Sequence, residues 1–459
     1  MQIFTTQKED ISGRLDCYYY QPEFVELEKR IKKKTNKILG DFVLGIAGGA
    51  TPNKLYSDKY YAKSADGGIP FLRVQNVTNE GLNFKNCKFI KPETHQGMLK
   101  RSQIKEDYLI TKITGVGRMA VSTVAPQNFE GNINQHLVAI KTKSREISEI
   151  LATFLNSDIG ERLASRRSTG GTRPALDYKA LLGIPVILNP KIVSVMQSAY
   201  KTREEKLKQA DKLLNSIDGY VRQQLDIDYT EPEEEKIYTV NLQDLEGSRQ
   251  DPHYHNPKFA TVIKQLKAGK YPIEILGKYI TEIRYGASLK NDYVDDGIPL
   301  LRIVNLKPNN IDLTDVVQLP KSKAKVMGNC YVYKGDLLIS RSGTIGIVAV
   351  VPKEADGFAY GSFMIKFKLN DELDSNYASV WLNSDISKLL VQRERIGAIQ
   401  GNITIPTIQG FLLPIPPLDR QKEIASGVTE KYRKVADLKN EASKLLEDAK
   451  KKVEEMILN

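Results

Sequence analysis

Residues 69–76, IPFLRVQN, return as residues 298–305, IPLLRIVN. This pair is the closest of at least six blocks that recur in the same order at spacings of 227 to 237 residues. Chance rarely preserves the order of so many matches, so the 459-residue chain is a duplicated unit. The fold of the chain is therefore given by the fold of one copy and by the segments that join the two copies.

Five further block pairs surround this stretch. They are Arg14–Phe24 with Arg249–Phe259, Leu39–Ala50 with Leu276–Ala287, Asp107–Val121 with Asp336–Val350, Leu155–Ile159 with Leu382–Ile386, and Ile184–Pro185 with Leu413–Pro414. In the third pair, Asp107-x-Leu109-Ile110 is matched with Asp336-x-Leu338-Ile339.

Each copy mixes two kinds of periodicity. Short β-branched runs predict strands at Phe71–Val77, Leu300–Leu306 and Ile345–Val351. Longer segments predict helices over Ile147–Arg166 and Tyr377–Arg395. The repeated Leu-Asn-Ser-Asp blocks fall near the middle of these helices, where we expect Ser and Asp to face solvent. Each copy is then an α+β globule.

After each globule comes a Lys/Glu-rich, proline-free segment, Lys191–Leu225 and Asp419–Ile457, with an apolar period near seven. The economical inference is that the two amphipathic helices pair as an antiparallel coiled coil, although each could instead pack only on its own globule. The expected seam residues are Tyr200, Leu207, Leu214, Val221, Tyr432, Val435, Leu446 and Val453. The predicted organisation is a globule over 1–188, a helix over 189–226, a linker over 227–236, a second globule over 237–417 and a helix over 418–459.

Composition excludes several classes of protein. Apolar residues make up 41% and charged residues 27%, which is typical of a soluble globular chain, and three scattered cysteines predict neither a zinc knuckle nor a disulfide framework. The longest aliphatic run, Ile345–Val351, is far shorter than the ~18 residues of a membrane span. The beginning of the sequence lacks a signal-peptide pattern, so we expect a cytoplasmic protein with no membrane contact.

The formal net charge is +11, and residues 1–190 hold most of the excess, with 28 basic and 19 acidic side chains. A basic surface favours a polyanion partner through phosphate neutralisation, although general solubility explains the charge equally well.

No catalytic or metal-binding motif emerges. His253-x-His255 is the only clustered histidine pair. The glycine-rich stretches at Gly45–Gly49 and Ser342–Gly346 match neither the Walker loop, which ends in Gly-Lys-Ser/Thr, nor the G-x-G-x-x-G motif, so we expect tight turns there. Asp251-Pro252-His253-Tyr254 resembles the Asp-Pro-Pro-Tyr motif of DNA amino-methyltransferases, but its counterpart in the first copy, Asp16–Tyr19, lacks the proline.

Taken together, the double Ile-Pro-x-Leu-Arg block, the double Asp-x-Leu-Ile block and the Ile-Pro or Leu-Pro ends that lead into long helices resemble the specificity (S) subunits of type I restriction-modification systems. The resemblance covers essentially the whole chain. It departs at residues 189–197, which lack the Pro-Pro-Leu-x-x-Gln pattern of residues 416–421.

The resemblance implies two target-recognition domains, each reading one half of a split site in double-stranded DNA, on an antiparallel coiled coil that docks methyltransferase (M) subunits, two of them by expectation, and restriction (R) subunits. It implies a non-catalytic chain without cofactors, with S-adenosylmethionine, ATP and Mg²⁺ on the partner subunits.

Direct readout needs Arg or Lys for guanine and Asn or Gln for adenine. Such residues meet glycine at 166–173 and 393–404, and weaker candidates follow a predicted strand in each copy. The candidate DNA-binding residues are Lys112, Arg118, Arg166, Arg167, Thr169, Arg173, Arg341, Arg393, Arg395, Gln400 and Asn402. Arg73 and Arg302 lie in the most similar block, so we assign them to the framework, because domains that read different half-sites should differ at the reading positions.

Two other functions stay open at this point. One is a self-sufficient DNA amino-methyltransferase that uses Asp251–Tyr254, and the other is a polyanion-binding scaffold without base readout. Binding of S-adenosylmethionine would favour the first. Binding to DNA with the same affinity for every sequence would favour the second.

Overall fold

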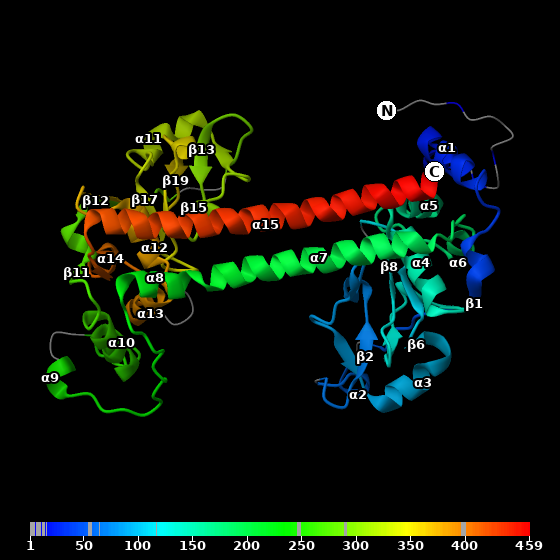
Figure 1. Cartoon of the computed structure of the whole chain (residues 1–459), viewed down its shortest axis with the longest axis horizontal. Helices are drawn as coiled ribbons and strands as arrows, with labels where there is room; N and C mark the ends of the chain where they lie inside the picture. The colour runs from blue at the N-terminus through cyan, green and yellow to red at the C-terminus, as the bar shows by residue number, and fades with distance from the viewer. Residues whose placement is uncertain are drawn as a thin grey trace. The chain divides into compact units, whose positions relative to one another are not determined.

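The computed structural model divides into two compact units (Figure 1). Unit 1 comprises Met1–Leu207 with Lys439–Asn459, and unit 2 comprises Lys208–Leu438. The structure describes residues 5, 11, 14, 16–53, 57–63, 65–115, 117–245, 249–288, 292–395 and 401–459. The long helices α7 (Pro190–Asn215) and α15 (Leu418–Leu458) each contribute one segment to either unit.

Unit 1 contains two sheets and a hairpin. The first sheet is antiparallel in the order β1-β10-β7-β8, and the second has the order β5-β2-β9-β6 with β2 and β9 parallel. The strands are β1 Val43–Gly48, β2 Ile69–Leu72, β5 Lys88–Ile90, β6 Gln103–Lys105, β7 Leu109–Lys112, β8 Ser122–Val124, β9 Glu130–Ile133 and β10 Leu137–Thr142, with β3 Val77–Thr78 and β4 Gly81–Leu82 forming the hairpin. The helices are α1 Pro22–Lys32, α2 Ser57–Tyr60, α3 Pro92–Ser102, α4 Arg145–Asn156, α5 Asp158–Arg167 and α6 Tyr178–Leu182.

Unit 2 repeats this plan. Its sheets have the orders β12-β20-β17-β18 and β16-β13-β19, with β13 and β19 parallel, beside the hairpin β14–β15 and the pair β11–β21. The strands are β11 Ile273–Ile275, β12 Ile280–Tyr285, β13 Ile298–Leu301, β14 Leu306–Lys307, β15 Asn310–Ile311, β16 Val317–Leu319, β17 Leu337–Ser340, β18 Val348–Val350, β19 Ala359–Tyr360, β20 Met364–Leu369 and β21 Leu412–Pro414. The helices are α8 Ile217–Leu225, α9 Leu242–Leu245, α10 Pro257–Lys267, α11 Ala324–Met327, α12 Ser375–Leu382, α13 Asp385–Glu394 and α14 Ile405–Gln409.

Strand β10 shows why its sequence, LVAIKT, reads as almost continuously apolar. Val138 and Ile140 pack in a core with the helices, whereas Leu137 and Ala139 pack in a second core with the other sheet. Alternate side chains of a strand point to opposite faces, so a strand between two covered faces must be apolar on both. In unit 2, Phe367 of β20 joins the helical core and Met364 joins the sheet core in the same way.

The expected single helices over Ile147–Arg166 and Tyr377–Arg395 are each two helices. The break falls at the Leu-Asn-Ser-Asp blocks, and the expectation that Ser faces solvent is wrong. Ser157 is buried and accepts a hydrogen bond from the Gly160 backbone N–H as the N-cap of α5, and Ser384 caps α13 in the same way. A Ser-Asp pair favours the start of a helix for two reasons. The serine oxygen accepts a hydrogen bond from an unpaired backbone N–H of the first turn, and the negative charge of the aspartate is stabilised by the positive end of the helix dipole.

The asparagine before each of these serines ties the helices to the sheet. The Asn156 amide donates to the carbonyl of Ser122 and accepts from its N–H, at 2.7 and 2.9 Å. Asn383 makes the same two bonds with Val348 of β18, at 2.7 and 3.2 Å. One side-chain amide thus replaces a missing strand partner in both units.

The matching of Asp107 with Asp336 is wrong by one residue. Strands β7 and β17 begin at Leu109 and Leu337, and the residue two before each, Asp107 or Gly335, has a left-handed φ of 67° or 90°. Gly335 therefore corresponds to Asp107, and Asp336 corresponds to Tyr108.

The predicted strands are only partly confirmed. Each of the first two, Phe71–Val77 and Leu300–Leu306, is a strand that ends in a 3-10 turn before a hairpin strand, and within Ile345–Val351 only β18 is extended. The tight turn expected at Gly45–Gly49 is wrong, because this stretch lies largely in β1. Gly343 and Gly346 do form a tight turn, with φ near 80°.

The two long helices are confirmed, and segments of them pack side by side within each unit. In unit 1, Met196 and Ala199 of α7 share a core with Ala449 and Val453 of α15. In unit 2, Val221 of α8 shares a core with Ile424 and Val428 of α15.

Polar contacts in unit 2 give the direction of this packing. Arg420 donates to Gln224, and Lys431 donates to Ser216, so the segments run antiparallel there. Within the described residues, no helix is long and apolar enough to cross a membrane.

Replacing Ser157 with alanine should lower the free energy of unfolding by about 1 kcal/mol, because the first turn of α5 loses its N-cap acceptor. Urea denaturation of the full chain measures this change. Ser194→Ala, at an exposed position inside α7, is the matched control and should cost no more than a few tenths of a kcal/mol. Equal effects of the two variants would contradict the capping role.

Candidate nucleic-acid interface

In both units, the loop after the third strand of the antiparallel sheet lies against the segment that precedes a short helix. Thr114 bridges to Ala175, and the Leu176 N–H donates to the Ile113 carbonyl at 2.8 Å. Ser342 bridges to Asn402, and the Ile403 N–H donates to the Arg341 carbonyl at 3.0 Å. Because the backbone bonds correspond one for one, the side chains of the two units can be compared position by position.

A third segment completes the cluster. The Ile113 N–H donates to the His136 carbonyl at 3.1 Å, and the Arg341 N–H donates to the Phe363 carbonyl at 2.9 Å. Three positions therefore converge at one end of each antiparallel sheet. We call them the reading cluster, and they are Ile113, His136 and Ala175 in unit 1 and Arg341, Phe363 and Asn402 in unit 2.

The reading cluster differs in chemistry at every position, although the backbone that carries it is the same. In unit 2 the Arg341 guanidinium lies 4.6 Å from the centre of the Tyr285 ring, and its Nε donates to Asn402 Oδ1 at 3.3 Å. The Phe363 ring is 52% exposed beside them. Arginine and asparagine are the side chains that read guanine and adenine in a bidentate manner, and an exposed ring can contact a thymine methyl group.

The cluster of unit 1 is extended by a short β-turn loop. Thr169 and Ala175 exchange two backbone hydrogen bonds of 2.8 Å, and Gly170 with φ of 95° closes the turn. Thr169 and Arg173 are exposed on this loop, as predicted from the sequence. Among the described residues, no hydrogen bond or ion pair engages the Arg173 side chain, so its guanidinium is available to a ligand.

Both units place a tyrosine ring across the same gap, but from opposite sides. In unit 1, Tyr178 at the start of α6 reaches over β1, where a Cβ on Gly48 would lie only 1.7 Å from its hydroxyl. In unit 2, Tyr285 at the end of β12 reaches back to the Ile405 N–H at the start of α14, at 3.3 Å. Both rings remain partly exposed beside the reading cluster, so an aromatic surface is common to the two sites.

Four of the candidate DNA-binding residues, Arg166, Arg167, Lys112 and Arg118, instead make contacts that stabilise the fold of unit 1. The prediction that Arg166 and Arg167 bind DNA is wrong, because they form the last turn of α5 and are buried. Both pair with Glu28 of α1, at 2.5 and 2.9 Å. Burial alone would favour the neutral acid, but Arg167, Lys32 and Arg166 together lower the pKa of Glu28.

The other two lie near the sheet. Lys112 is buried at the end of β7, and this burial lowers its pKa. Arg118 donates to the Asn156 carbonyl and pairs with Asp158, both at distances near 2.8 Å, so it braces the junction between α4 and α5.

Arg393 belongs to a cluster that explains the repeated Arg-x-Asp-x-x-Tyr block. The Tyr254 ring lies between the guanidinium groups of Arg393 and Arg249, 4.1 and 5.0 Å from its centre. Tyr19 lies between Arg166 and Arg14 in the same way, at 4.2 and 4.7 Å. Each tyrosine thus clasps the end of the helix that leads toward the reading cluster.

Asp251 serves this clasp. Although partial burial opposes the charged form, the Tyr254 N–H and the Arg249 side chain lower the pKa of Asp251. His253 bonds to the Gln392 carbonyl and His255 to that of Arg249. Among the described residues, no group of three or more potential ligands is placed to hold a metal ion.

The remaining predicted residues lie near the second cluster. Arg395 is the exposed C-cap of α13, while Gln400 lies outside the described residues. The sequence analysis missed His136, Phe363, Tyr178 and Tyr285. The sequence does contain a pattern that could have identified two of them. His136 and Phe363 each stand directly before an apolar strand, at matching positions of the two copies, and yet they differ in residue type.

Several known proteins are similar to this chain. A family model of the type I restriction modification DNA specificity domain matches residues 281–448. The chain is 21% identical over 387 residues to the EcoKI specificity subunit of Escherichia coli K12, which covers 80% of this chain and 76% of that subunit. It is 20% identical over 343 residues to the MjaVIII specificity subunit of Methanocaldococcus jannaschii, which covers 72% and 74%. A match to the EcoBI specificity subunit of Escherichia coli spans 32% of this chain and 31% of that subunit.

A solved structure shares the fold. It is described as "Structural basis underlying complex assembly and conformational transition of the type I R-M system", and one of its chains matches with a TM-score of 0.54 and 16% identity over 92% of this chain and 95% of that chain.

Most of unit 2 is thus a DNA specificity domain. The chain is thus similar to the specificity subunits of type I restriction-modification systems, as the resemblance of its motifs implied.

Glu28→Ala should lower the free energy of unfolding of the full chain by about 3–5 kcal/mol, because it leaves two buried guanidinium groups without their carboxylate. The pKa of Glu28 is lowered by folding, so its contribution is present above its ordinary value of 4.5 and is lost as the pH falls further. Urea unfolding at neutral and acidic pH measures both effects. The control is Glu26→Ala, an exposed position of the same helix. The same small loss in both variants would contradict a stabilising role for the ion pairs of Glu28 with Arg166 and Arg167.

Proposed function

We propose that the chain reads a bipartite target in double-stranded DNA, one half-site per unit, through the two reading clusters. The observation that carries this proposal is that Arg341, Phe363 and Asn402 stand on the same backbone positions as Ile113, His136 and Ala175. Two readers of one ancestral plan need constant scaffolding and different contact side chains. Arg173 and Arg395, exposed beside the clusters, supply further cations for base edges or phosphates.

We further propose that α7, α8 and α15 form an antiparallel coiled coil along their length. The burial of Val221, Val435 and Val453, and the partial burial of Leu214 and Leu446, support this proposal. Leu207 is half-buried. Tyr200 and Tyr432, which the heptad pattern predicts for the seam, each hydrogen-bond to a hairpin of their own unit, so they serve the attachment of the domains.

The proposed partners are methyltransferase subunits, two of them, and restriction subunits. The exposed Lys/Glu-rich faces of the long helices support docking along them. The solved structure that shares the fold concerns complex assembly in a type I system. In this proposal S-adenosylmethionine, ATP and Mg²⁺ bind to the partner subunits.

Arg341→Ala should weaken binding to DNA that carries the half-site of unit 2 by about 1–3 kcal/mol, because a bidentate base contact is lost. Competition binding at fixed salt, with either half-site scrambled, measures the change. Lys353→Ala, an exposed position at the other end of the same sheet, is the matched control. An equal loss on every sequence would reduce Arg341 to a phosphate contact.

Leu446→Asp should disrupt the packing of α15 in unit 1, because a charge would enter a core that contains Met196 and Val453. We expect a lower unfolding midpoint and weaker co-purification with a methyltransferase subunit. Lys444→Asp, two residues earlier on the exposed face, serves as the control. If both variants assemble alike, the assignment of Leu446 to the seam is wrong.

A further inference from the structure

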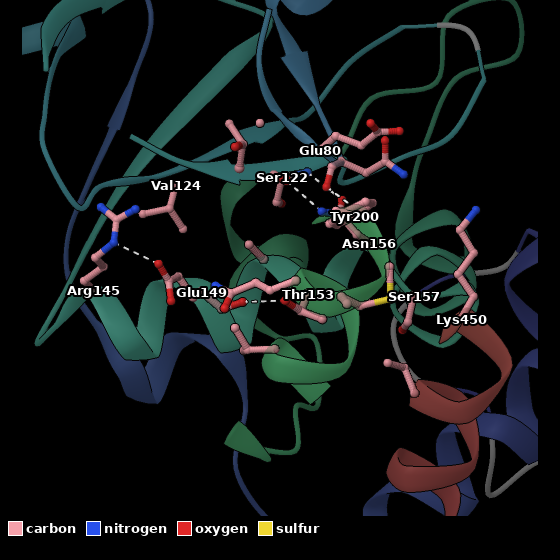
Figure 2. A pocket seen from close by; sticks show the side chains of 18 residues that line it. Glu80, Ser122, Val124, Arg145, Glu149, Thr153, Asn156, Ser157, Tyr200 and Lys450 are labelled. Atoms are coloured by element: carbon pink, nitrogen blue, oxygen red, sulfur yellow. Dashed lines mark hydrogen bonds and ion pairs between the residues drawn. The ribbon is translucent and has the colours of Figure 1, made fainter. Parts of the chain in front are cut away.

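A cavity of about 260 Å³ lies in unit 1 beneath the hairpin β3–β4 (Figure 2). Ser122 of β8 and Asn156 of α4 line one wall, and Tyr200 of α7 lines another. The turn of the hairpin, Asn79–Glu80, covers the cavity. The Tyr200 hydroxyl donates to the Asn79 carbonyl at 3.0 Å, and burial raises the pKa of Tyr200 to about 12, so the hydroxyl keeps its proton.

The charged residue of this turn points away from the floor. Glu80 pairs with Arg203 of α7 at 2.8 Å, and its side chain is 42% exposed. Among the described residues, no hydrogen bond joins the turn Asn79–Glu80 to β8 or α4. The hairpin is therefore attached to α7 by one tyrosine hydroxyl and one exposed ion pair, and exposed ion pairs contribute little.

Unit 2 fills the same place with Asn309. The hairpin strands pair Val77 with Leu82 in unit 1 and Leu306 with Ile311 in unit 2, so Asn309 corresponds to Glu80. Asn309 has a left-handed φ of 58°, which asparagine tolerates better than most residues, and this conformation turns its amide inward.

Four hydrogen bonds converge on Asn309. Its backbone N–H donates to the Val348 carbonyl at 2.9 Å, and its Oδ1 accepts from Ser379 Oγ at 2.9 Å and from Asn383 Nδ2 at 3.1 Å. Its Nδ2 donates to the Tyr432 hydroxyl at 3.4 Å. Asn309 thus joins the hairpin to β18 through its backbone N–H, and to α12 with its C-cap Asn383 and to the long helix α15 through its side chain.

Two side-chain differences account for the cavity. Ser379 stands four residues before Asn383, and the residue four before Asn156 is Ala152, which offers no hydroxyl. Glu80 is longer than asparagine and carries a charge, and burying that charge without a partner would be costly. The same floor therefore receives a side chain in unit 2, whereas in unit 1 no side chain of the described hairpin turn hydrogen-bonds to it.

We propose that Asn309 is a positioning residue that locks the hairpin of unit 2 to its long helix, and that unit 1 lacks this lock. The hairpin β3–β4 can then shift over its cavity, while β14–β15 is held. For DNA recognition, which rests on the proposed function, the unit 1 reader is the adaptable one and the unit 2 reader is the rigid one.

Hydrogen exchange of the full chain without DNA tests the lock. We expect the amides of residues 77–82 to exchange on the order of tenfold faster than those of residues 306–311, since about one to three net hydrogen bonds separate the two hairpins. Asn309→Ala should accelerate exchange of residues 306–311 by a similar factor and leave β17 unchanged. Asn310→Ala, the exposed neighbour, should change neither.

A transplant provides the converse test. The double variant Glu80→Asn with Ala152→Ser supplies unit 1 with both missing groups and should slow exchange of residues 77–82. The proposal is overturned if the transplant has no effect, if the two wild-type hairpins exchange alike, or if Asn309→Ala accelerates exchange throughout unit 2.

DNA binding then separates the lock from the proposed function. Asn309→Ala should leave the preferred bases of both half-sites unchanged and increase the tolerance of binding to a spacer that is one base pair longer or shorter. Faster exchange of the unit 2 hairpin without any change in spacer tolerance would overturn the consequence for DNA and leave the lock standing. Absence of sequence preference in the wild-type chain would instead contradict the proposed function.

Discussion

Each unit depends on one asparagine amide, half-buried at Asn156 and buried at Asn383, that stands between a sheet and a pair of helices. Asn156 and Asn383 each donate to and accept from the backbone of an edge strand, and the serine that follows each of them caps the next helix. A buried amide costs free energy unless it is paired, so these bonds specify one register between sheet and helices. The helix that begins there ends at the Arg–Tyr–Arg clasp and directs the chain to the reading cluster.

On this constant framework the two units differ in the side chains of the reading cluster, of which Ile113 is buried in the core of unit 1 and Phe363 is exposed in unit 2. The clasp repeats with the same residue types in both units, whereas Arg341, Phe363 and Asn402 replace Ile113, His136 and Ala175. A protein that must tell two sequences apart can vary base-contacting side chains without altering the scaffold, because direct readout depends on the groups presented and on their geometry. A tyrosine ring spans this gap in both units, supplied from α6 in one and from β12 in the other.

The two hairpins show a second way in which the copies have diverged. The side chain of Asn309 links its hairpin to α12 and to the long helix α15, while Glu80 is exposed beside Arg203 and leaves a cavity below. Neither difference alters the strand order, yet they change how firmly a recognition unit is attached to its helix. In the proposed function attachment matters, because a rigid joint positions a reader at low entropic cost and a loose one accommodates variation in the DNA.

The duplication, the α+β class and the two long helices followed from the order of residues, since ordered repeats and heptad periodicity can be recognised without knowledge of contacts. The resemblance to type I specificity subunits followed from the repeated motifs. The same patterns indicated Arg173 and Asn402, because arginine and asparagine beside glycine can reach base edges, and Arg341, because it follows a predicted strand. They misassigned Arg166 and Arg167, because only the fold brings Glu28 to them from 138 or more residues away. They missed His136 and Phe363, whose role follows from convergence with two distant loops, and they shifted the Asp107 match by one residue. Burial, charge pairing and the exact register of strands are relations between distant residues, so they emerge only when the folded chain brings those residues together.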